Sequence, residues 1–133
     1  MITKGIKQLC AEAEAEIETW TVEQAQQHMN DDDVVIVDIR DVRELWRDGT
    51  IPGAVHAPRG MLEFWVDPES PYAREDFQSG KRFVFFCAAG ARSALATKAV
   101  QDMGLKPVCH IGGGFGAWKE ADMPIEPREQ KPR

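Results

Sequence analysis

Short strand-like segments alternate with helix-forming segments along most of the chain, and this alternation constrains the fold more than any other feature. The clearest strands lie at 34–37 and 81–86, which are apolar and rich in β-branched or aromatic residues. Such runs are typical of strands buried on both faces of a parallel sheet. Shorter strands are predicted at 18–20, 54–56 and 106–111. We therefore expect a doubly wound α/β domain with a small central parallel sheet flanked by helices.

Helix-forming segments separate these strands. Residues 4–18 alternate with period two, but Ala and Glu are strong helix formers, so composition favours a helix there. Further helices are predicted at 22–29, 41–47, 91–103 and 115–120, with weaker helical signals at 59–65 and 73–77. The 133 residues are enough for one domain. We divide the chain into a helical extension (1–17), one domain (18–125) and a polar tail (126–133) that we expect to be frayed.

Charge and cysteine content exclude several classes of protein. The net charge of −6 gives no overall attraction to nucleic acid or to anionic lipid. Three cysteines are too few for a disulfide framework. The N-terminal segment lacks the apolar stretch of a secretory signal, and the apolar runs are too short to span a bilayer. We therefore expect a cytoplasmic protein with no membrane or nucleic-acid partner.

The loop after the strand at 81–86 contains the strongest candidate for chemistry. Ligands of parallel sheets bind beyond the carboxyl ends of the strands, which is where this loop lies. It reads Cys87, Ala88, Ala89, Gly90, Ala91, Arg92 and Ser93. Small residues let the backbone curl so that its N–H groups form an anion-binding nest, and the following helix adds its positive N-terminal end. Both features favour a thiolate at Cys87, which is the nucleophilic form. An isolated cysteine is more often an inert buried residue, but this setting favours catalysis.

In this loop and in two other segments the chain resembles the rhodanese family of cysteine-dependent sulfurtransferases. The other segments are 37–40 with Glu44 and 49–54, and 113–118 with Pro124. The resemblance covers about 19–124 and implies a five-stranded rhodanese-like sheet. It also implies that Cys87 takes sulfur from thiosulfate or a persulfide, holds it as a persulfide among the loop amides, and passes it to cyanide, a thiol or a protein cysteine. No metal or organic cofactor is implied.

The loop departs from the family pattern in its charge. Many members that use thiosulfate have a basic residue directly after the cysteine, where this chain has Ala88. Ala91 adds no polar group either, so Arg92 is the only cation of the loop. This favours a less charged persulfide donor or a partner protein over the thiosulfate dianion. The similar phosphatase loop is one residue longer between its Cys and Arg, so phosphatase or arsenate reductase activity is a weaker alternative.

Two further groups of residues lie near strand ends. We interpret Asp38 and Arg40 as a pair that ties loops together, because charges at strand ends are usually paired. Arg59, with Phe64 and Trp65, is a candidate rim of the pocket that would select the donor or acceptor. Ordinary surface charge and core aromatics explain the same residues equally well. We interpret Thr50 and Asp122, which replace the family's usual His and Gly, as structural variations.

The remaining chemistry-bearing residues give weaker signals. Cys109 lies in a predicted strand and is interpreted as a buried structural thiol, and Cys10 as incidental. The three histidines and the cysteines lack the spacing of a zinc site. We expect a monomer or a homodimer. The alternatives to an enzyme are a persulfide carrier with low turnover and a binding or regulatory module of the same fold.

Overall fold

The strands form one parallel sheet, as the run of apolar segments predicts. The computed structural model describes residues 1–131, and its sheet has the order β1-β5-β4-β2-β3 with every pairing parallel. The strands are β1 (Glu18–Trp20), β2 (Val34–Asp38), β3 (Val55–His56), β4 (Arg82–Phe86) and β5 (Val108–Ile111). The predicted doubly wound, five-stranded α/β fold is therefore confirmed.

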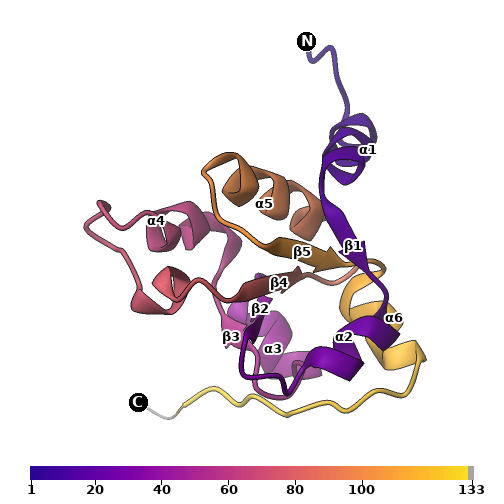
Figure 1. The fold of residues 1–133 in the computed structure, drawn as a ribbon. Helices are drawn as coiled ribbons and strands as arrows, with labels where there is room; N and C mark the ends of the chain where they lie inside the picture. Colours follow the sequence, from indigo (N-terminus) through magenta and orange to yellow (C-terminus); the bar gives the residue numbers. More distant parts are fainter. Residues whose placement is uncertain (132–133) are drawn as a thin grey trace.

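Helices cover both faces of the sheet (Figure 1). They are α1 (Ile6–Glu16), α2 (Val22–His28), α3 (Val42–Asp48), α4 (Leu62–Val66), α5 (Ala91–Asp102) and α6 (Gly114–Glu120). Two short 3-10 turns, η1 (Arg59–Met61) and η2 (Glu75–Gln78), flank α4 in the chain. Helices α1, α4 and α5 lie on one side of the sheet in Figure 1, and α2, α3 and α6 lie on the other.

Side-chain alternation along the strands builds a separate core on each face. In β4, Phe83 and Phe85 pack with residues of α4 and α5, whereas Val84 and Phe86 pack with residues of α2 and α6. All four are fully buried. A strand with both faces buried has no polar positions, which explains its continuous apolar sequence.

Some boundaries differ from the predictions. The last strand begins at Val108 and not at residue 106, and Pro107 just before it has no N–H for the ladder. The helical signal at 59–65 is a 3-10 turn followed by α4. The first part of the C-terminal segment contacts the domain, since Glu126 forms an antiparallel bridge with Thr50 and Arg128 donates to the carbonyl of Ala54. Residues 132–133 of the predicted tail lie outside the described part.

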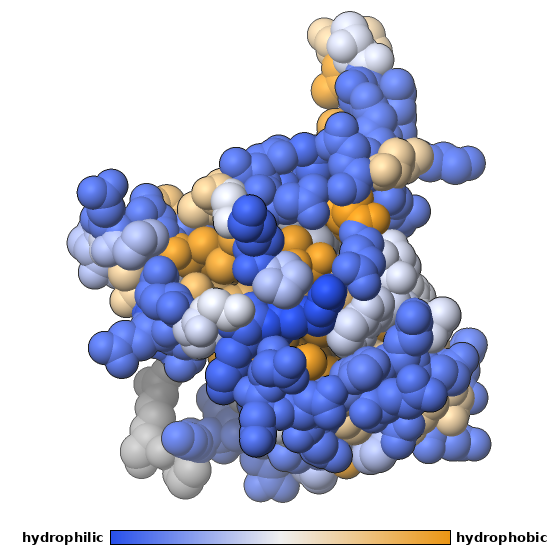
Figure 2. Space-filling view, in the orientation of Figure 1, coloured by the Kyte–Doolittle hydropathy of each residue, from blue (hydrophilic) through white to orange (hydrophobic). Residues whose placement is uncertain are grey.

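The surface is largely polar in the view of Figure 2, with apolar surface visible between α4 and α5. An open cavity of about 440 Å³ lies where α4, η2 and the end of α5 meet. Its lining residues, which include Val66, Phe77 and Leu105, do not belong to the cysteine loop. Within residues 1–131, no helix has both the length and the apolar character needed to cross a bilayer.

Candidate functional site

Cys87 follows β4 directly and lies on the face of the sheet that α5 covers. It shares that face with Phe83 and Phe85, because every second residue of a strand points the same way. The end of β2 is held beside it, since Ile39 N–H donates to the carbonyl of Phe86 at 3.1 Å. Cys87 is only 1% exposed. The thiol is therefore buried at the carboxyl end of the sheet.

The loop after Cys87 directs hydrogen-bond donors at its sulfur. The backbone N–H groups of Gly90 and Ser93 lie 3.1 and 3.3 Å from Cys87 Sγ. Gly90 has a φ of 109°, a left-handed conformation that suits glycine, and α5 begins at the next residue. Donors and a helix N-terminus directed at one atom stabilise negative charge on it. The loop can therefore hold a thiolate or a negatively charged persulfide.

Helix α6 holds the outer side of this loop. Phe115 and Gly116 donate their N–H groups to the carbonyls of Cys87 and Ala88, at 2.8 and 2.9 Å. A Cβ at Gly114 would lie 2.5 Å from the carbonyl oxygen of Cys87, so only glycine fits there. Because these carbonyls point outward to α6, the loop can turn its N–H groups inward to the sulfur.

The cation of the loop is already paired. Arg92 donates from Nη1 and Nη2 to both carboxylate oxygens of Glu44 on α3, at 2.8 and 3.1 Å. This bidentate hydrogen bond lowers the pKa of Glu44 and raises the pKa of Arg92. The carboxylate offsets the positive charge that Arg92 would otherwise offer to an anionic donor.

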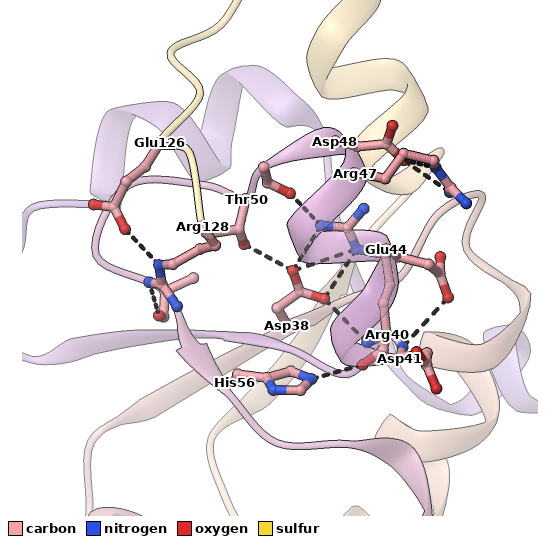
Figure 3. Close-up of polar contacts among 12 residues, drawn as sticks. Asp38, Arg40, Asp41, Glu44, Arg47, Asp48, Thr50, His56, Glu126 and Arg128 are labelled. Carbon is pink, nitrogen blue, oxygen red and sulfur yellow. Dashed lines mark hydrogen bonds and ion pairs between the residues drawn. The ribbon is translucent and has the colours of Figure 1, made fainter. Parts of the chain in front are cut away.

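Asp38 and Arg40 form a buried ion pair beside the loop, shown in Figure 3. Arg40 Nη2 donates to Asp38 Oδ2 at 2.8 Å and to the carbonyl of Gly49 at 2.7 Å. The Thr50 hydroxyl donates to Asp38 Oδ2 at 2.7 Å. The Arg40 guanidinium also lies 4.3 Å from the ring centre of Phe115. The pair thus joins the end of β2 to the 49–50 loop and to α6.

Comparison with known proteins identifies this arrangement. Residues 21–121 match the family described as the rhodanese-like domain. The chain belongs to this family. The rhodanese-like domain contains β2, β4, β5 and α6, the elements that surround the cysteine loop.

Relatives of this rhodanese-like domain include sulfurtransferases. A mouse protein, thiosulfate sulfurtransferase/rhodanese-like domain-containing protein 3, is 27% identical over 106 residues, which are 76% of this chain and 68% of the relative. A structure from Rhodopseudomonas palustris, of unknown function and described as a possible tyrosine phosphatase, is 60% identical with a TM-score of 0.92, over 95% of this chain and 97% of that one. The polysulfide-sulfur transferase homodimer of Wolinella succinogenes is 28% identical with a TM-score of 0.69, over 92% of this chain and 87% of that one.

The predicted rim of this rhodanese-like domain lies partly near the loop. Arg59 N–H donates to the carbonyl of Ile39, which places its backbone at the same edge of the sheet as Cys87. Its guanidinium pairs with Glu63 at 2.6 Å. Phe64 is exposed, and Trp65 packs under Arg74. The structure brings these residues together around α4, and their contact with a donor or acceptor stays a prediction.

The other two cysteines have different surroundings. Cys109 is buried in β5, and burial raises the pKa of its thiol to about 12. This is the setting of an inert structural thiol. Cys10 on α1 lies 3.8 Å from the carbonyl oxygen of Ala91, so the N-terminal extension packs beside the cysteine loop. Among the residues described, no cluster of three or more potential metal ligands is found.

His110 is a residue near the reactive sulfur that the sequence patterns did not indicate. This residue of β5 lies with its Nδ1 atom 2.9 Å from Ser93 Oγ, and Ser93 Oγ lies 3.5 Å from Cys87 Sγ. Side chains alternate along β5, so His110 points to the same side as Val108, which faces α5. The contact of His110 with Ser93 on α5 is a tertiary contact, which the sequence alone does not predict.

Proposed function

We propose that this chain is a sulfurtransferase in which Cys87 carries the sulfur. The Cys87 thiolate attacks the outer sulfur of a sulfane donor, and the sulfur–sulfur bond of the donor breaks. The bonding electrons leave with sulfite when the donor is thiosulfate, or with a thiolate when it is a persulfide. A thiol, a protein cysteine or cyanide then attacks the outer sulfur of the Cys87 persulfide and regenerates the thiolate. The reaction needs no cofactor.

The observation that carries this proposal is the pair of backbone N–H groups, from Gly90 and Ser93, that converge on Cys87 Sγ. Such donors stabilise the thiolate before transfer and the persulfide anion after it. They are preorganised, because the carbonyls on the other side of the loop are bound to α6.

The loop's charge favours a persulfide or polysulfide donor over thiosulfate. Arg92 shares its charge with Glu44, and Ala88 and Ala91 add none. The names of two relatives mention both donor classes, since one is called a thiosulfate sulfurtransferase/rhodanese-like domain-containing protein and the other a polysulfide-sulfur transferase. That second relative is a homodimer, and we propose a monomer or homodimer here. A catalytic thiolate suits the reducing cytoplasm.

Phosphatase chemistry fits the loop less well. Four residues separate Cys87 from Arg92, which is one fewer than in phosphatases of similar architecture. The Arg92 guanidinium is also bound by a carboxylate, which would repel a phosphoryl group. We therefore expect little hydrolysis of phosphate monoesters by this protein.

The test is thiocyanate formation from cyanide, with thiosulfate in one arm and glutathione persulfide in the other. Wild type, Cys87→Ser and Cys10→Ser are compared, the last as a control for a free thiol outside the cysteine loop. We expect turnover in wild type and Cys10→Ser, faster with the persulfide, and none above background in Cys87→Ser. Mass spectrometry should find one added sulfur on Cys87. Failure to load Cys87 from either donor, or efficient hydrolysis of p-nitrophenyl phosphate, would overturn the proposal. Addition of sulfur to Cys87 without thiocyanate turnover would overturn the proposal that the protein is an enzyme and would indicate a persulfide carrier.

A further inference from the structure

A buried row of three side chains connects β5 to the reactive sulfur. His110 Nδ1 lies 2.9 Å from Ser93 Oγ, which in turn lies 3.5 Å from Cys87 Sγ. His110 and Ser93 are at most 1% exposed. The other ring nitrogen of His110, Nε2, has no hydrogen-bond partner among the described residues. A buried polar atom without a partner is rare in native proteins and needs an explanation.

The surroundings of His110 favour the neutral form of its imidazole. Burial lowers its pKa from the ordinary value, because a charged ring is disfavoured away from water. Glu14 on α1 is the charged group that acts on the ring in the opposite direction. On the loop side the ring meets Ser93, with Cys87 beyond it. A neutral imidazole has one N–H and one lone pair, so its tautomer decides what it offers to Ser93.

The partnerless Nε2 atom favours one tautomer of His110 over the other. With the proton on Nε2, that N–H is buried without an acceptor. The Ser93 hydroxyl then has to donate its proton to Nδ1. With the proton on Nδ1, the ring donates to Ser93 Oγ, and only a lone pair is left without a partner. Buried donors without partners are rarer than acceptors without partners, which favours the second arrangement. In that arrangement the hydroxyl proton of Ser93 is free to donate elsewhere.

Two acceptors compete for the hydroxyl proton of Ser93. The carbonyl of Gly90 lies 3.3 Å from Ser93 Oγ and Cys87 Sγ lies 3.5 Å from it. When the sulfur is negative, the charge-assisted hydrogen bond to sulfur is the stronger one. We propose that His110 is a positioning residue, whose Nδ1–H binds Ser93 Oγ and so directs the hydroxyl proton of Ser93 onto the Cys87 sulfur.

The inference deepens the proposed function, on which it rests for the role of Cys87, but its test needs no sulfur donor. The readout is the alkylation rate of Cys87 by iodoacetamide at about pH 7, which follows the thiolate fraction. All variants carry Cys10→Ser, and the peptide containing Cys87 is measured by mass spectrometry. His110→Leu and His110→Gln remove the donor at the Nδ1 position, and His110→Asn retains one there. We expect alkylation about threefold to tenfold slower in the first two, as for the loss of one hydrogen bond, and a rate near wild type in His110→Asn.

A double-mutant cycle separates positioning from general damage. Ser93→Ala should slow alkylation by itself, and adding His110→Leu or His110→Gln to it should cause no further loss. Thr97→Val is the matched control, because it removes another buried hydroxyl of α5, one turn beyond Ser93. It should alkylate at the wild-type rate. The inference is overturned if folded His110→Gln reacts at the wild-type rate, if His110→Asn is as slow as His110→Gln, or if the losses in the double variant simply multiply. Normal coupling in a protein without sulfur transfer would overturn the proposed function alone.

Discussion

The backbone N–H of Phe115 donates to the carbonyl oxygen of Cys87 at 2.8 Å, so the first turn of α6 and the cysteine loop are held together. The adjacent pair, Gly116 to Ala88, repeats the contact at 2.9 Å. These contacts use the free N–H groups at the start of a helix, which have no partner within it. The shape of the sulfur site therefore depends on a segment 27 positions further along the chain than Cys87, at Gly114.

Gly114→Ala should damage both stability and sulfur transfer. Its φ of 59° is strained for alanine, and the new Cβ would meet the carbonyl of Cys87 at 2.5 Å. We expect the free energy of unfolding in urea to fall by about 3 kcal/mol or more. The kcat should fall by a larger factor than KM rises. Gly53→Ala is the control, because it has a similar φ of 80° but open space for a Cβ. Equal losses in the two variants would show that strain alone, and not the contact with Cys87, requires glycine.

Arg40→Leu should destabilise the fold strongly, because it leaves the Asp38 carboxylate buried without its counter-ion. Breaking a buried pair on one side usually costs about 3–5 kcal/mol. Arg47→Leu is the control, since Arg47 pairs with Asp48 at the surface and should change stability far less than Arg40→Leu. The free energy of unfolding in urea measures both. A loss below about 1 kcal/mol in Arg40→Leu would mean that water reaches Asp38.

Glu44→Gln should improve the use of thiosulfate. It removes the carboxylate that offsets Arg92, so the loop becomes more positive toward a dianion. We expect the KM for thiosulfate to fall about threefold to tenfold, with a smaller change for glutathione persulfide. Asp48→Asn removes a carboxylate from an exposed pair and should leave both constants unchanged. An unchanged or higher KM in Glu44→Gln would show that Arg92 is needed to hold the loop and not to attract the donor.

The stability of the protein should fall at mildly acidic pH because of His110. Burial lowers the folded-state pKa of His110 below 6.5, so the unfolded chain binds more protons as the pH drops through this range. The destabilisation begins as the pH falls through the unfolded value and levels off below the folded one. Between about pH 7.5 and about pH 5, wild type should lose more unfolding free energy than His110→Asn, by at most about 1.4 kcal/mol per pH unit. Parallel pH profiles would show that the ring is protonated in the fold without penalty.

Local sequence patterns were enough to predict the parallel sheet and to locate the cysteine loop. The apolar segment that became β4 has both faces buried, and a strand of that kind has no polar positions to obscure it. The sequence from Cys87 to Ser93 is contiguous, so its small residues, its glycine and the start of α5 could be recognised together. The bounds of β5 and the contacts of Glu126 were not predicted, since they depend on partners distant in the chain.

The amino-acid sequence alone determined the fold class, the family resemblance and the identity of the candidate nucleophile, because each is encoded by neighbours along the chain. Tertiary packing brings Glu44 to Arg92, α6 to the outer side of the loop and His110 to Ser93. These contacts join residues 17 to 48 positions apart, and folding alone sets their distances. The chemical character of the sulfur site is therefore local, and its charge and hydrogen bonding are set by the packing of α3, α6 and β5 around it.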